Sequence, residues 1–69
     1  MENKIIELEN NKKYIVISST IYDEKIYCLL VNEEDEDEML IGQIDNESIE
    51  VINDDKLYNE LSKIFYDTL

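Results

Sequence analysis

The stretch IYCLLV, residues 26–31, is apolar throughout and shows no alternation of apolar and polar positions. An uninterrupted apolar run bounded by turn residues is typical of a strand that is covered on both faces of its sheet. Turn-forming or charged residues border this run on both sides, as DEK at 23–25 and as the acidic run EEDEDE at 33–38. We therefore expect a central strand over about residues 25–32.

Segments rich in isoleucine, valine, threonine and tyrosine lie on both sides of the central run, and these residue types are enriched in strands. Asparagine and aspartate separate the segments at 10–12 (NNK) and 45–47 (DNE), where a hairpin needs residues that accept a positive φ. We expect four further strands, over about residues 5–9, 13–21, 39–44 and 48–52.

The strand expected over residues 13–21 has two faces, because successive side chains of a strand point to opposite sides. One face carries Ile15, Ile17, Ser19 and Ile21, and the other carries Tyr14, Val16, Ser18 and Thr20. The first set is the more apolar, so we expect it to point toward the core.

The period of the apolar residues changes near the end of the chain. Five of them recur at i, i+1, i+4, i+7 and i+8, which places them on one stripe of a helix: Leu57, Tyr58, Leu61, Ile64 and Phe65. Asn53 or Asp54 can cap such a helix, which we expect over about residues 54–67. The predicted fold is a single α+β domain over residues 1–69, with a four- to five-stranded antiparallel meander packed by one C-terminal amphipathic helix.

Composition excludes several classes of function. The 69 residues include 18 acidic and six basic residues, for a formal net charge of −12, with no histidine and one cysteine. Without histidine the usual acid–base group at neutral pH is missing, and one cysteine rules out disulfide frameworks and multi-thiolate zinc sites. So few cations argue against binding to nucleic-acid phosphates or to an anionic membrane.

Metal and catalytic interpretations of the carboxylates find little support. The acidic run 33–38 lacks the glycine that an EF-hand calcium loop needs at its sixth position. General acid–base catalysis needs a carboxyl group buried enough to keep its proton, whereas every acidic residue here lies in a polar stretch or at a turn. Cys28 has no histidine to activate it, and we expect it to be a buried apolar residue. We therefore expect no enzyme activity, no cofactor and no metal site.

The acidic run 33–38 is the strongest functional signal, and adjacent charges at this density favour a loop or hairpin tip. It is either a solvated turn that keeps a short protein in solution or a lure for a basic surface. Carboxylates two residues apart on a strand lie about 6.6 Å apart and can imitate nucleic-acid phosphates. The residues expected to bind a partner are Asp23, Glu24, Glu33, Glu34, Asp35, Glu36, Asp37, Glu38, Asp45 and Glu47, with Tyr14 and Tyr22 as apolar anchors.

The function predicted from these residues is a non-enzymatic acidic module that docks on the basic, nucleic-acid-binding surface of a partner protein. The alternative is a scaffold or small homodimer that uses the sheet face left uncovered by the helix. No segment reads as a signal peptide or a membrane span, and a lone cysteine in an apolar strand suits a reducing compartment. We therefore expect a soluble cytoplasmic protein.

The pattern of apolar and acidic residues resembles the YrzB-like proteins, which are short, very acidic bacterial proteins with a domain of unknown function. The residues that carry the resemblance are Tyr14, Val16, Tyr27, Leu29, Leu30, the acidic run, Ile44, Val51, Ile52, Asp54, Asp55, Leu57, Leu61 and Phe65. The chain departs from that family in lacking a glycine at the turn 23–25 and in being shorter after the acidic run. The resemblance implies a bacterial or phage origin and no known enzymology. By size and charge alone, the chain is also similar to small acidic phage inhibitors such as anti-CRISPR and anti-restriction proteins.

Overall fold

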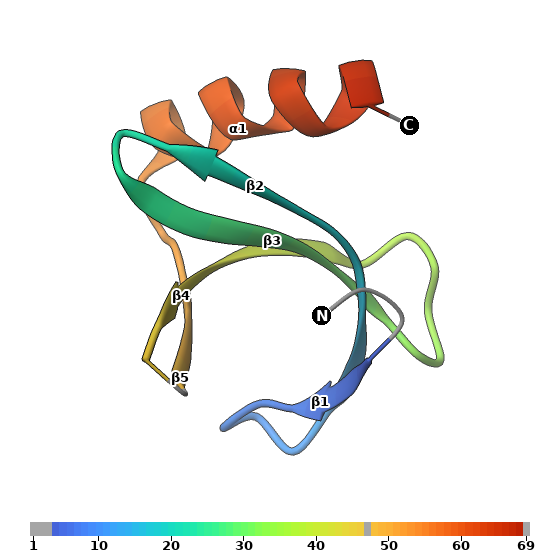
Figure 1. Ribbon diagram of the computed structural model, residues 1–69. Helices are drawn as coiled ribbons and strands as arrows, with labels where there is room; N and C mark the ends of the chain where they lie inside the picture. Colours follow the sequence, from blue (N-terminus) through green and yellow to red (C-terminus); the bar gives the residue numbers. More distant parts are fainter. Residues whose placement is uncertain (1–3, 47, 69) are drawn as a thin grey trace.

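In the part of the chain that the structure describes, five antiparallel strands follow one another in the order β1-β2-β3-β4-β5 within one curled sheet, and one helix follows them (Figure 1). The computed structural model describes residues 4–46 and 48–68. The elements are β1 (Ile5–Glu7), β2 (Lys13–Tyr22), β3 (Lys25–Asn32), β4 (Met39–Asp45), β5 (Ser48–Val51) and α1 (Asp55–Thr68). The predicted α+β class, with a five-stranded meander and a C-terminal helix, is confirmed.

Six element ends differ from the prediction by one or two residues, and β2, β4 and α1 each extend one residue further, to Tyr22, Asp45 and Thr68. β1 ends at Glu7 rather than at residue 9, because Leu8 already belongs to the turn, where its carbonyl accepts from Asn11 N at 3.0 Å. β5 ends at Val51, although Ile52 N still donates to Ile41 O at 2.9 Å. The helix begins at Asp55 because Asp54 caps it. Asp54 is one of the two residues, with Asn53, that were predicted as the cap.

The cap on α1 consists of two hydrogen bonds. Asp54 Oδ1 accepts from Lys56 N at 3.0 Å and from Leu57 N at 3.2 Å, which satisfies two of the amide groups that the first turn of a helix leaves without a partner. The helix then lies across one face of the sheet (Figure 1). Among the described residues, no helix combines the length and the apolar character needed to cross a membrane.

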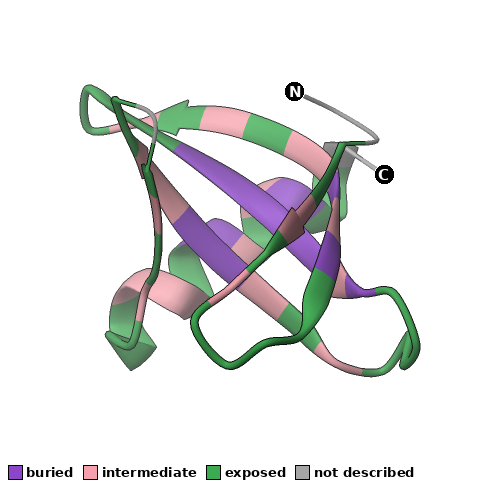
Figure 2. Cartoon of the chain, turned by 90° about the horizontal axis from the view of Figure 1, so that it is seen from below, coloured by how far each residue is buried: buried purple, intermediate pink, exposed green. Residues whose placement is uncertain are grey.

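The sheet separates two apolar layers. Tyr14, Val16, Cys28 and Leu30 fill its concave side, and a second cluster lies between its other face and the helix. That cluster consists of Tyr27, Leu29, Ile41, Leu61 and Phe65. β3 contributes alternate residues to both layers, which explains why residues 26–31 are apolar without alternation. Figure 2 shows the buried residues gathered in the middle of the strands and the turns exposed.

The predicted core face of β2 was wrong. Ile21 is 73% exposed, whereas Tyr14 and Val16, which belong to the face expected to point away from the core, are fully buried. An irregularity in the pairing of β2 with β3 between Val16 and Ser18 shifts the register, and such a bulge exchanges the faces of the strand on either side of it. Of the four residues expected to face the core, Ile17 is the one that packs against the helix-side cluster, where it is partly buried.

Gly42 allows the sheet to curl. Gly42 lies in β4 and pairs with Cys28 of β3. A Cβ atom at position 42 would lie 2.6 Å from Ile49 Cγ2. Real Cβ atoms essentially never lie this close to another atom, so a larger residue at position 42 would force Ile49 or its strand to shift. The meander curls into a half-open barrel (Figure 1), and the bulge in β2 and the close approach at Gly42 both favour this curvature.

Candidate functional site

The acidic run forms a loop, residues 33–38, that connects β3 to β4; we call it the acidic loop. Asn32 organises it from the end of β3, where its side chain is only 8% exposed. Asn32 Oδ1 accepts from Glu34 N at 2.7 Å and from Asp35 N at 3.2 Å. These two bonds form an Asx turn, which fixes the direction in which the acidic residues leave the sheet.

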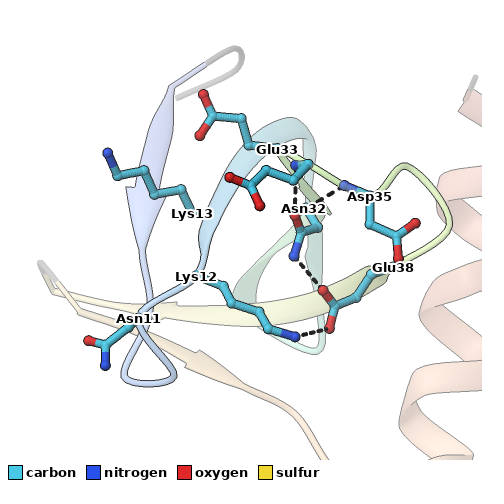
Figure 3. A pocket seen from close by; sticks show the side chains of 8 residues that line it. Asn11, Lys12, Lys13, Asn32, Glu33, Asp35 and Glu38 are labelled. Atoms are coloured by element: carbon cyan, nitrogen blue, oxygen red, sulfur yellow. Dashed lines mark hydrogen bonds and ion pairs between the residues drawn. The ribbon is translucent and has the colours of Figure 1, made fainter.

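Glu38 closes the loop. Its carboxylate accepts a hydrogen bond from Asn32 Nδ2 and lies 3.4 Å from Lys12 Nζ (Figure 3). The bond from Asn32 lowers the pKa of Glu38, with further help from Lys12 and Tyr14 and against the opposing effect of desolvation. The carboxylate therefore stays ionised and serves as an acceptor rather than as a proton donor.

The remaining five carboxylates of the acidic loop are exposed. Asp35 takes part in the loop's internal bonds, since its Oδ1 accepts from Asp37 N at 3.0 Å and its carbonyl accepts from Glu38 N at 3.1 Å. Among the described contacts, no hydrogen bond or ion pair involves the carboxylates of Glu33, Glu34 and Glu36. The acidic loop thus presents a dense negative surface on an ordered backbone.

A hollow of about 390 Å³ lies beside the acidic loop (Figure 3). Lys12 and Lys13 border it on one side and acidic residues border it on the other, so its walls carry both signs of charge. Its shallow, polar character differs from the largely apolar pockets that hold small molecules. The hollow offers no enclosed site for a substrate.

The predicted binding residues divide between two ends of the sheet. The acidic loop lies at one end, and Asp23, Glu24 and Asp45 lie at the opposite end, in or beside the β2–β3 and β4–β5 turns (Figure 1). Eight residues of β3 separate the ends, a distance of about 25 Å at the usual rise of a strand. Glu47 lies outside the described residues. The acidic set is therefore two separate surfaces rather than one row.

The two tyrosines expected to anchor a partner have different surroundings. Tyr14 is fully buried and its hydroxyl accepts from Asn10 Nδ2 at 3.2 Å, so it belongs to the core and the expectation of an exposed anchor was wrong. Tyr22 is half-buried and packs edge-to-face against Tyr27, with ring centroids 6.4 Å apart. Tyr22 also lines a shallow hollow with Asp54 and Glu60, at the end of the sheet away from the acidic loop.

Cys28 is a free, buried thiol within the concave layer. Burial raises its pKa, although a hydrogen bond with the Gly42 backbone acts in the opposite direction. A thiol that keeps its proton and lacks solvent access is a poor nucleophile. Over residues 4–46 and 48–68, no three acidic, cysteine or histidine side chains come together in an arrangement that could hold a metal ion.

Asn32 is the residue of the candidate site that the sequence analysis missed. The signal that could have found it is an asparagine directly after an apolar strand and before a polar loop, which is a common start of an Asx turn.

Comparison of the chain with family models, curated proteins and solved structures finds no match.

Proposed function

We propose that the chain is a non-enzymatic acidic module that docks through its acidic loop on the basic, nucleic-acid-binding surface of a partner protein. One observation carries this proposal: five consecutive exposed carboxylates stand on a loop that the buried Asn32 holds in place. A loop that is ordered before binding loses less conformational entropy when it docks. This favours a binding role over that of a merely solvated turn.

Long-range attraction would bring the partners together. A formal net charge of −12 on 69 residues creates a negative field that speeds encounter with a basic groove. Exposed ion pairs add only about 0–1 kcal/mol each, so a tight complex also needs an apolar contact. Met39 directly follows the acidic loop and is 48% exposed, and its flexible side chain is suited to such a contact. In this proposal Met39 takes the anchoring role expected of Tyr14.

We place this activity in the cytoplasm, supported by the buried free thiol of Cys28, since unpaired thiols persist in reducing compartments. We also propose a relationship to YrzB-like bacterial proteins or to phage inhibitors of similar size and charge. The alternative, a scaffold or homodimer formed through an uncovered sheet face, has less support. Tyr14 and Val16 were expected on that face and are buried inside the curled sheet.

The test is capture of partners from a bacterial lysate by three forms of the tagged chain, in low-salt and high-salt buffer. The first form is unchanged. The second carries Glu33→Gln, Glu34→Gln and Asp37→Asn in the acidic loop, which leaves the structural bonds of Asn32 and Glu38 intact. The third carries Asp23→Asn, Glu24→Gln and Asp45→Asn at the opposite end of the sheet, so it loses the same number of charges.

We expect a captured protein that is lost at high salt, lost with the loop variant and retained by the variant of the opposite end. Duplex DNA or RNA added to the beads should release it, because the proposal places the chain and the nucleic acid on one surface. If both variants capture equally little of the partner, capture depends on the net charge of the chain and not on the acidic loop. Capture that resists nucleic acid would refute the mimicry, and capture indifferent to salt and to the loop variant would refute the proposal as a whole.

A further inference from the structure

The open side of the curled sheet contains a groove of about 660 Å³ that lies between the edges of β1 and β5. Within the described residues, β1 pairs only with β2 and β5 pairs only with β4, so the barrel is not closed (Figure 1). The groove shares no lining residue with the acidic loop. It is a second, separate surface.

Both edges turn outward backbone groups that have no strand partner among residues 4–46 and 48–68. On β1, Val16 N donates to Lys4 O at 2.8 Å, and beyond the end of the strand Leu8 N donates to Lys12 O at 3.1 Å. Backbone groups of a strand alternate in direction, so the intervening Ile5 and Glu7 direct their N–H and C=O groups away from β2. Such an edge is a template for one more strand.

β5 shows the same alternation of backbone groups. Ile52 N donates to Ile41 O at 2.9 Å, and the register pairs Glu50 with Gln43. The alternation therefore leaves the peptide groups of Ile49 and Val51 directed away from β4. The groove is thus bordered on two sides by free strand edges, which is the arrangement that accepts an added strand from a partner.

The side chains around the groove define the chemistry of that strand. Leu8, Leu40 and Ile49 are half-buried, pack on the concave layer and also line the groove. Val51 lines it too and is 41% exposed. This floor offers apolar contact to every second side chain of an inserted strand, since alternate side chains of a strand point to the same face.

The rim is acidic. Glu7, Glu9 and Glu50 are exposed and border the groove, and no lysine lies among its described lining residues. Carboxylates on the rim attract cations and repel a second acidic edge. A second copy of this chain would bring the same carboxylates against one another, so charge argues against self-pairing at this groove.

We propose that the groove between β1 and β5 binds an extended segment of a partner protein in which apolar residues alternate with lysine or arginine. The segment adds a strand to one or both edges, places its apolar residues on Leu8, Leu40 and Ile49, and places its cations beside Glu7, Glu9 and Glu50. This inference goes beyond the docking of the acidic loop and stands whether or not that loop binds a folded basic surface.

The experiment is a titration of the ¹⁵N-labelled full chain with an end-blocked peptide of ten residues in which valine and lysine alternate. We expect amide shifts concentrated at Ile5, Glu7, Ile49 and Val51. Hydrogen exchange at these amides should slow, because the added strand supplies acceptors for their outward-facing groups. Two control peptides accompany it, one with alternate backbone nitrogens methylated and one with glutamate in place of lysine.

Two charge variants of the chain test the role of the rim. Glu7→Gln with Glu50→Gln should weaken binding of the valine–lysine peptide by about threefold to tenfold, the range expected for two partly screened ion pairs. Glu33→Gln with Glu34→Gln removes the same charge from the acidic loop and should change binding by less than about twofold. Spectra of the free variants establish that both fold as the parent does.

Several results would overturn the proposal. The methylated peptide binding as tightly as its parent would exclude strand addition, and equal binding of the glutamate peptide would exclude the acidic rim. Shifts centred on the acidic loop would place the binding site there instead of in the groove. Equal weakening by both variants would show that net charge, not the rim, drives binding. No amide shift at millimolar peptide would show that the groove does not bind the peptide. Groove amides that shift with the concentration of the chain alone would identify a second copy as the occupant instead.

Discussion

Asn32 and Glu38 fasten the acidic loop to the sheet through both side chain and backbone: Asn32 Nδ2 donates to the Glu38 carboxylate, and Asn32 N donates to Glu38 O at 3.0 Å. One of the six acidic residues is therefore used inside the molecule to display the other five. The contact with the last residue of β3 adds to the bonds that Asp35 makes within the loop.

The contact with Asn32 should make part of the stability depend on acid. Because the pKa of Glu38 is lowered in the folded chain, the ionised form stabilises the fold above the ordinary glutamate pKa, and this contribution is lost as the pH falls through the lower, folded value. Urea melts of the parent and of Glu38→Gln should therefore differ near neutral pH and converge in acid. Glu36→Gln removes the same charge from an exposed position and corrects for the general relief of repulsion. A difference from this control that stays constant with pH would contradict the prediction.

The close approach at Gly42 predicts a large effect of one added methyl group. Gly42→Ala would place Cβ 2.6 Å from Ile49 Cγ2 and should lower the free energy of unfolding by about 1–3 kcal/mol, as overpacking does. Ile49→Ala removes the opposing atom, so the double variant should lose less than the sum of the two single variants. Additive losses in denaturant melts would show that the two positions do not collide.

The β2–β3 turn predicts a substitution that stabilises. Asp23 and Glu24 have φ values of 51° and 65°, and the left-handed region costs an ordinary side chain roughly 1–2 kcal/mol. Glu24→Gly removes this strain but adds chain entropy to the unfolded state, so we expect a net gain of up to about 1 kcal/mol in thermal or urea melts. Glu24→Gln keeps the strain and removes the charge. A gain with glutamine equal to that with glycine would assign the effect to charge.

The helix stripe predicts that Leu61 is essential to the fold. Leu61 is fully buried between α1 and the sheet, and Leu61→Ala should cost about 2–5 kcal/mol, a large part of the stability of a small protein. Leu61→Val, a milder truncation, keeps the measurement within range if the alanine variant unfolds. Tyr66→Ala, at an exposed position of the same helix, serves as the control. Losses below about half a kcal/mol at Leu61 in urea melts would contradict this role.

The sequence predicted the order and type of the elements because those features depend on local patterns. The apolar run of β3 is short and bounded by turns, which indicates a covered strand, and the spacing of Leu61 and Phe65 indicates a helix. The face of β2 was not predictable in this way, because the bulge after Val16 follows from pairing with β3 and leaves no local signal. The curl of the sheet likewise depends on contact between Gly42 and Ile49, which meet only once β4 and β5 have paired.

The candidate site was predicted in part. The acidic run at residues 33–38 forms an exposed loop, as expected, but its grouping with Asp23 and Asp45 overlooked a rule of meanders. Successive turns of a meander lie at alternate ends of the sheet, so the β2–β3 and β4–β5 turns share one end and the β3–β4 loop occupies the other. The groove between β1 and β5 was missed because it exists only after the sheet has curled.

The sheet is a common wall of two interiors, since β3 directs Tyr27 and Leu29 to one side and Cys28 and Leu30 to the other. Removal of α1 would expose the apolar layer on one side of the sheet to solvent. Unpairing of β1 or β5 would expose the layer on the other side. Neither half is left with a closed interior of its own. The molecule should accordingly melt in a single concerted step, and a shortened version without its helix would be an unfolded chain rather than a smaller protein.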